Sequence, residues 1–150
     1  MSFTKLTDDG QPKFGPMATD GSRIYFTEAL PGPRNFLVQV SVKGGDTGPL
    51  TVPLKQPWVL DLSRDGPDLL LANDELNEAH YQAFSLWLQP VAGGSPRRVG
   101  TVLAGTTGFG PSAGFGTDGA SIIYGEDRIF IRRPRTVRRL IRSSRQKTIP

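Results

Sequence analysis

Cysteine is absent from this chain of 150 residues, and histidine occurs once, at His80. Without thiols the chain forms neither disulfides nor thiolate metal sites, although cysteine-free proteins occur on both sides of membranes. Long apolar runs are missing as well: no segment offers the roughly 18 apolar residues that a membrane span needs, and the opening MSFTKLTDDG lacks the apolar stretch of a secretory signal. We therefore expect a soluble chain with no transmembrane segment, and its localisation, periplasmic or cytoplasmic, stays open.

Acidic residues are missing from the C-terminal end. From Arg128 to Pro150 the chain has nine Lys and Arg residues and no Asp or Glu, whereas the part up to Asp127 has nine basic and 14 acidic residues. The net charge of +4 therefore comes from the C-terminal end and not from the body of the chain. We predict a basic tail over residues 132–150.

The basic tail is a candidate for electrostatic binding. Its cations can neutralise several phosphates and so favour salt-sensitive, sequence-independent binding to nucleic acid or to an anionic membrane. If the tail is helical, Val137, Leu140 and Ile141 fall on one side of a short amphipathic segment. An Arg-rich end that departs from the pattern of the chain is equally typical of a disordered tail or of a replaced C-terminus. The candidate contact residues are Arg132, Arg133, Arg135, Arg138, Arg139, Arg142, Arg145 and Lys147.

Glycine and proline shape the rest of the chain. The 18 Gly and 13 Pro residues interrupt short runs of Val, Ile, Leu, Tyr and Phe that seldom reach the length of a helix. This composition predicts an all-β fold, and the length is that of one ordinary domain.

An Asp-Gly turn followed by a short apolar, β-prone run occurs three times: TDGSRIYFTE from Thr19, SRDGPDLLLAND from Ser63 and GTDGASIIYGED from Gly116. The Asp-Gly pairs lie 45 and then 53 residues apart, and two Gly-Gly pairs, Gly44-Gly45 and Gly93-Gly94, lie 49 apart. These intervals are close to the roughly 40 to 50 residues of a four-stranded propeller blade. The recurrence predicts stacked copies of one antiparallel meander.

The predicted strands follow from alternating apolar runs between turn residues. The first unit, residues 17–55, is expected to have three strands and the second, residues 56–105, four; the third, residues 106–131, is incomplete because no Gly-Gly turn follows it. Residues 1–131 would then form a partial β-propeller of four-stranded blades. The predicted strands are Arg23–Glu28, Phe36–Val42, Pro49–Val52, Trp58–Leu62, Asp68–Ala72, Phe84–Val91, Arg97–Leu103, Phe109–Phe115, Ala120–Tyr124 and Arg128–Ile131.

The repeated units resemble a known protein family. The segments MATDGSRIYFTE, LVQVSVKGGDTGPL, VLDLSRDGPDLLLAND, LWLQPVAGGSPRRVGTVL and GFGTDGASIIYGEDRIFI together resemble the TolB-like β-propellers, within the broader WD-repeat-like class. In particular they look like the propeller half of bacterial transcriptional regulators that join a CadC-like winged helix to such a propeller. The resemblance covers about residues 1–131, and the phrase L-x-P-V-x-GG-x-P-R-R is its most specific part.

The resemblance implies a non-enzymatic interaction or sensory module with an unknown protein partner. A TolB-like propeller usually has six blades and this chain supplies two to three, so we expect a fragment of a larger regulator or TolB-like protein. The opening FTKLTDDGQPKFGP is similar to the outer strand of a preceding blade that runs into an inner strand. Two end blades would expose apolar faces, which favours self-association.

One Gly-rich stretch matches two short motifs, one typical of a catalytic serine and one typical of a nucleotide-binding loop. Residues 110–114 fit G-x-S-x-G around Ser112, but no histidine follows the serine and the β-prone sequence after it argues against the helix of a nucleophile elbow. Residues 108–113 fit a loose G-x-G-x-x-A nucleotide fingerprint, which also needs a helix. We therefore predict no catalytic and no cofactor-binding residues.

Carboxylates cluster between Asp61 and Glu78, yet their spacing matches no calcium loop. Asp65 and its counterparts Asp20 and Asp118 are better explained as turn residues that accept hydrogen bonds from nearby backbone N–H groups. No metal site is predicted. The strand aromatics are assigned to packing between blades, with a ligand surface at the mouth of the ring as the alternative for some of them; they are Tyr25, Phe26, Phe36, Trp58, Phe84, Trp87 and Tyr124.

Overall fold

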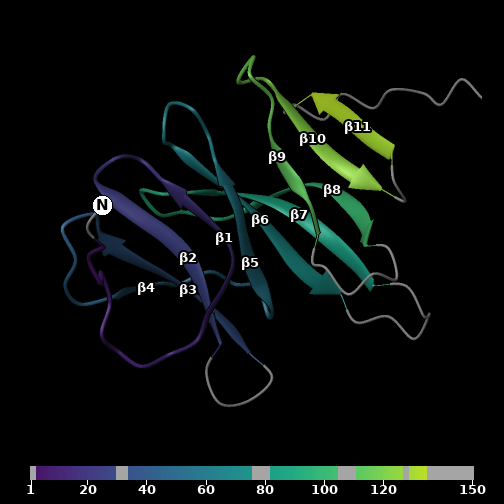
Figure 1. The fold of residues 1–150 in the computed structure, drawn as a ribbon. Helices are drawn as coiled ribbons and strands as arrows, with labels where there is room; N and C mark the ends of the chain where they lie inside the picture. Colours follow the sequence, from purple (N-terminus) through teal and green to yellow (C-terminus); the bar gives the residue numbers. More distant parts are fainter. Residues whose placement is uncertain (1–2, 30–33, 76–81, 105–110, 127–128, 135–150) are drawn as a thin grey trace, which may run out of the picture.

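A computed structural model of the chain describes residues 3–29, 34–75, 82–104, 111–126 and 129–134. These residues form three antiparallel sheets and contain no helix, so the all-β prediction is confirmed (Figure 1). Within these ranges, accordingly, no helix qualifies as a membrane span. Sheet A contains β1 (Lys13–Thr19), β2 (Arg23–Ala29), β3 (Asn35–Ser41) and β4 (Gly48–Leu50); sheet B contains β5 (Pro57–Leu62), β6 (Asp68–Glu75), β7 (Gln82–Pro90) and β8 (Arg97–Ala104); sheet C contains β9 (Ala113–Phe115), β10 (Ser121–Glu126) and β11 (Ile129–Pro134).

Each sheet is a meander whose strands pair in chain order. The Asp-Gly turns join the first two strands of each sheet, and the Gly-Gly turns join β3 to β4 and β7 to β8, as predicted. Gly21, Gly66 and Gly119 adopt φ values of 84°, 75° and 64°, a backbone region that side chains with a Cβ seldom enter. The repeated sequence signal therefore encodes one repeated backbone unit.

Sheet A differs from the prediction because it has four strands and not three. β1 begins at Lys13, ahead of the expected unit boundary at residue 17. β1 is the inner strand expected in the opening segment, which the boundary at residue 17 left out of the first unit; Gly15 and Pro16 fall in an irregularity of the β1–β2 pairing between Phe14 and Ala18. At the other end β11 continues to Pro134, beyond the expected limit at residue 131.

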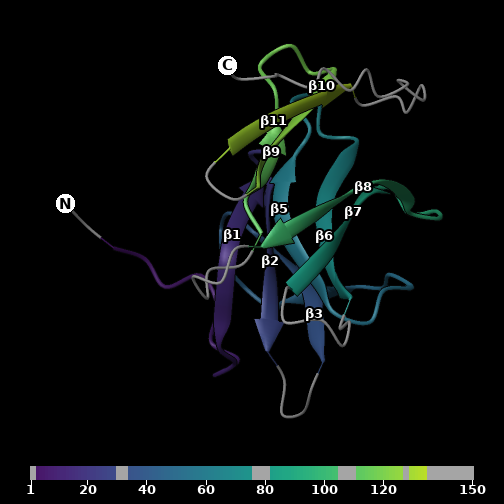
Figure 2. The same ribbon diagram turned by 90° about the vertical axis from the view of Figure 1, so that its right-hand side faces the viewer.

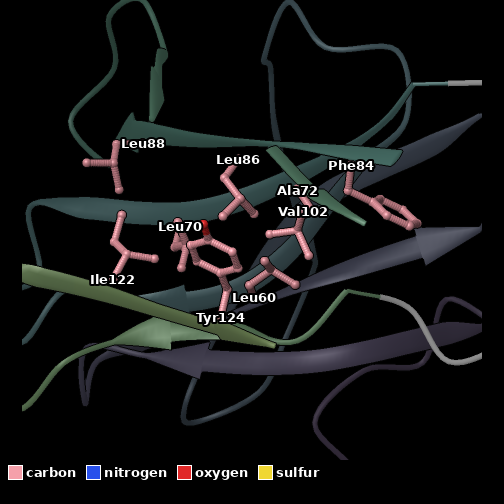
Figure 3. Close-up of a cluster of buried hydrophobic side chains, with 9 residues drawn as sticks. All are labelled: Leu60, Leu70, Ala72, Phe84, Leu86, Leu88, Val102, Ile122 and Tyr124. Atoms are coloured by element: carbon pink, nitrogen blue, oxygen red, sulfur yellow. The ribbon is translucent and has the colours of Figure 1, made fainter. Parts of the chain in front are cut away.

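The largest buried cluster lies between sheets B and C (Figure 3). Alternate side chains along β6 and β7 face sheet C, which contributes Ile122 and Tyr124. Burial of this size stabilises the junction by about 1.5–3 kcal/mol for each fully buried large apolar side chain. The cluster consists of Leu60, Leu70, Ala72, Phe84, Leu86, Leu88, Val102, Ile122 and Tyr124.

A second cluster joins sheet A to sheet B. Tyr25 and Leu37 from sheet A meet Val59, Leu69 and Leu71 from sheet B, and all five are at most 1% exposed. The two faces of sheet B are thus both covered, one by each neighbouring sheet. This is the arrangement of consecutive blades, in which every blade packs on the blades before and after it.

The inner strands of the three sheets lie next to one another. β1 and β9 both pack against β5, and the three strands lie close together near the middle of Figure 2. An edge-to-face chain of aromatic rings follows this seam: the ring centroids of Phe14 and Trp58 are 4.9 Å apart, and those of Trp58 and Phe84 are 6.2 Å apart. Of the aromatic residues predicted to pack between blades, Trp58 does so here against Phe14 of sheet A, whereas the prediction is wrong for Phe36, which is 39% exposed.

Candidate functional site

Two side chains reach from one sheet to the backbone of the next. The hydroxyl of Thr27, in β2, accepts a buried hydrogen bond of 2.9 Å from the amide of Val59, and Asp61 Oδ2 accepts one of 2.7 Å from the amide of Phe115. The pairing of β5 with β6 has a register shift between Val59 and Asp61, which indicates a β-bulge. A bulge leaves backbone groups without a partner in their own sheet, so the Val59 amide is free to bond to the neighbouring sheet. The first contact joins β2 to the inner strand β5, and the second joins the inner strands β5 and β9.

Gly114 is required by the second of these contacts. A Cβ at this position would lie 3.1 Å from Asp61 Oδ2, the atom that accepts the hydrogen bond from Phe115. The glycine therefore lets β9 approach β5 closely enough for the carboxylate to reach the backbone.

A groove of about 350 Å³ opens beside this junction. Its walls come from the irregular part of β1, from the segment leading into β9, and from β10. Most of the lining is apolar, and Ser112, which is exposed, adds a hydroxyl. The residues that define it are Pro16, Pro111, Ser112, Phe115, Ile123 and Tyr124.

Ser112 lies in this groove, but its surroundings are not those of a nucleophile. The chain passes from Ser112 directly into strand β9 and then into the Asp118-Gly119 turn, so residues 111–126 contain strands and turns and no helix. A nucleophile elbow and a dinucleotide loop both need a helix at this point. The carbonyl oxygen of Ser112 accepts a hydrogen bond of 3.0 Å from the amide of Gly125, which ties the segment to β10. His80 lies outside the described residues.

The turn function predicted for the three aspartates is confirmed at two of them. Asp20 Oδ1 accepts hydrogen bonds from the amides of Ser22 and Arg23 at 2.8 and 2.7 Å, and Asp118 Oδ1 accepts equivalent bonds at 3.1 and 3.0 Å. In the middle turn the acceptor is Ser63 Oγ, 3.0 Å from the amide of Asp68, so the prediction for Asp65 is wrong. A hydroxyl two positions earlier satisfies the same donor and leaves Asp65 exposed.

Asp20 also accepts a hydrogen bond of 2.8 Å from the hydroxyl of the buried Tyr25. Burial alone would raise the pKa of Asp20, but the bonds from the Arg23 amide, the Tyr25 hydroxyl and Ser22 outweigh it and hold the pKa below its usual value. The pKa of Tyr25 is raised by burial and by the neighbouring carboxylate. A charged and hydrogen-bonded Asp20 thus anchors the first turn to the core at neutral pH.

Sequence reasoning did not find the buried polar atoms near the far end of β6. Asp74 Oδ1 and Trp58 Nε1 are buried and have no hydrogen-bond partner among the described residues. Burial raises the pKa of Asp74. Because the folded pKa is raised, Asp74 supports folding fully at pH below its unfolded value and loses that support as the pH rises through the folded value. Only the three-dimensional environment distinguishes Asp74 from the other acidic residues between Asp61 and Glu78.

The predicted cationic residues divide into two groups. Arg132 and Arg133 belong to β11, where they pair with Ile123 and Ile122 of β10, so these two residues form part of a sheet and not of a tail. The remaining candidates, Arg135, Arg138, Arg139, Arg142, Arg145 and Lys147, lie outside the described residues.

Comparison with known proteins gives no family assignment. No protein-family model matches the chain, and no curated protein sequence matches it significantly.

Proposed function

We propose that the chain is a non-enzymatic interaction or sensory module of the TolB-like, WD-repeat-like β-propeller type. Two features support this proposal: the three meander sheets pack through their inner strands, and each begins with the same Asp-Gly turn. By resemblance to bacterial CadC-like regulators, the module would be the sensory part of a transcriptional regulator.

The observation that carries the proposal is the groove beside β9. Its apolar lining suits side chains of a partner, and its position at the inner strands is where propellers present their central surface. Extended peptide has the shape and hydrogen-bonding capacity to follow such a groove. We therefore propose an extended segment of a partner protein, with apolar side chains, as the ligand class.

Replacing Ile123 with glutamate is expected to weaken peptide binding at least about tenfold, because it puts a charge among apolar groove residues. The probe is a peptide selected from a random library displayed on phage against the intact chain, and its affinity is measured by titration calorimetry. Val42→Glu is the matched control, since Val42 and Ile123 are both 38% exposed and Val42 lies outside the groove. Equal affinity for the wild type and the Ile123 variant, or failure to select any peptide, would contradict the proposal.

A second proposal rests on the charge pattern of the C-terminal end, where no acidic residue follows Asp127. We propose electrostatic binding of nucleic acid or anionic membrane through this end. Removing residues 135–150 keeps β11 and deletes the six remaining candidate cations. The truncated chain is expected to bind unrelated DNA duplexes at least about tenfold more weakly at low salt and with a shallower salt dependence. Unchanged binding, measured by fluorescence anisotropy, would refute this proposal and leave the groove proposal intact.

A further inference from the structure

The middle of the outer face of sheet A, the side turned away from sheet B, is buried although none of the described sheets packs on it. Strand alternation turns Tyr25 and Leu37 toward sheet B and their neighbours toward the opposite side. On that opposite side Phe26, Val38 and Val40 are only 3%, 5% and 2% exposed. The expectation of an exposed apolar end face is therefore wrong for the middle of sheet A, whereas Phe36, on the same face, is 39% exposed.

The N-terminal segment lies against this side of sheet A, where its Asp9 pairs with Lys13, the residue next to the ring of Phe26. Residues 3–12, which we term the strap, contain no strand and are attached at both ends of sheet A. At the β3–β4 turn the carbonyl oxygen of Leu6 accepts a hydrogen bond of 3.2 Å from Gly45, and at the other end the carbonyl oxygen of Pro12 accepts one of 3.1 Å from Ala29. The strap does not form the outer strand that the sequence predicted for it.

Charged groups hold the strap against this face. Lys13 pairs with Asp9 of the strap and, at 3.0 Å, with the buried Glu28, and its ammonium lies 5.8 Å from the ring centroid of Phe26. The bond from Lys13 lowers the pKa of Asp9 to about 2, so the pair is ionised at neutral pH. Asp9 also accepts a long hydrogen bond of 3.4 Å from Thr47. These contacts are few and partly solvated, in contrast to the strand ladders of the sheets.

The position that the strap occupies is the one at which a preceding sheet docks. Leu69 and Leu71 lie four and six residues after Asp65 and pack on sheet A; Ile122 and Tyr124 lie four and six after Asp118 and pack on sheet B. Ile24 and Phe26 occupy the same two places after Asp20. The side chains under the strap thus correspond to those that form the two sheet–sheet junctions.

Sheet C is the last of the three described sheets, and its side turned away from sheet B corresponds to the sides by which sheets A and B pack on the sheet that follows them. Ile123 lies five residues after Asp118, as Tyr25 and Leu70 lie after Asp20 and Asp65. Tyr25 and Leu70 are buried against the following sheet, whereas Ile123 is 38% exposed and lines the groove. One chain therefore has the two kinds of face that meet in a sheet–sheet junction. The outer face of sheet A is beside the strap, and the face of sheet C that includes Ile123 is exposed at this residue.

We propose that the strap is a displaceable cap that competes with sheet C of a second copy for the outer face of sheet A. Displacing the strap exposes Phe26, Val38 and Val40, and the open face of sheet C is the surface that matches them. The contact joins different faces of the two copies, so it is heterologous and extends to a ring or to a larger assembly. The strap keeps the isolated chain from associating through this face.

Two variants release the strap, and sedimentation equilibrium measures the result. The first lacks residues 1–11. The second, Asp9→Lys, keeps the whole chain and places a cation beside Lys13, so it does not depend on whether the truncated chain folds. Asp65→Lys is the matched control, because it makes the same charge change at an exposed position away from the strap. Circular dichroism verifies that each variant keeps its strand content.

Both strap variants are expected to raise the apparent association constant at least about tenfold, and Asp65→Lys to leave it unchanged. Adding Ile123→Glu to either strap variant is expected to return the association constant to the wild-type value. Folded Asp9→Lys protein with wild-type association would overturn the proposal. Association that persists with Ile123→Glu would also overturn it, since sheet C would then not be the partner surface.

Discussion

Replacing Leu70 with alanine is expected to lower the free energy of unfolding by about 3–5 kcal/mol, the largest effect of any single substitution proposed for this chain. Leu70 is fully buried in the cluster between sheets B and C, where it lies near Ile122 and Tyr124 of the neighbouring sheet. The substitution removes apolar contacts from both sheets and leaves a cavity that strands held by hydrogen-bond ladders cannot close.

Urea denaturation followed by circular dichroism measures this effect. Val42→Ala serves as the control, because Val42 is 38% exposed and its truncation should change stability by no more than about 0.5 kcal/mol. A loss for Leu70→Ala below about 1 kcal/mol would mean that the side chain is not enclosed by sheet C. The same cluster predicts that sheets B and C unfold in one transition.

Replacing Thr27 with valine is expected to cost about 1–3 kcal/mol, because it leaves the amide of Val59 buried without an acceptor. Valine has nearly the shape of threonine, so packing changes little and the lost hydrogen bond accounts for the effect. The lost hydrogen bond joins sheet A to sheet B, so the substitution weakens the junction between the two sheets and leaves the strand pairing within each sheet intact.

Thr27→Ser is the matched control for this effect. Serine keeps the hydroxyl and loses a methyl group, which costs about 1 kcal/mol in a buried site. Hydrogen exchange of the Val59 amide adds a local readout: it should speed up in the valine variant more than global stability accounts for. A valine variant as stable as the wild type would show that the Val59 amide has another acceptor.

The sequence predicts the units of this fold well because their signals are local. Asp-Gly and Gly-Gly turns require particular backbone angles, and alternating runs such as Phe36–Val42 lie within a residue or two of the observed strands. Where local signals are weak the prediction failed. The start of the first unit was placed at residue 17, inside β1, and Ser63 replaced Asp65 as the acceptor of the middle turn.

The junctions between sheets were beyond the reach of sequence reasoning. Thr27 and Val59, or Asp61 and Phe115, are far apart along the chain and have ordinary residue types, so no spacing rule connects them. The groove was missed for a similar reason, since its walls come from β1, β9 and β10. The strap was predicted as a strand because its sequence resembles one, whereas its backbone hydrogen bonds join it to the β3–β4 turn and to the end of β2.

The three sheets follow one another as blades, with β5 between β1 and β9, and a nitrogen-edited NOESY spectrum checks this order. We expect a cross peak between the Val59 amide proton and side-chain protons of Thr27, and another between the Phe115 amide proton and the β protons of Asp61. A spectrum with the expected peaks within each sheet and neither of these two peaks between sheets would contradict it.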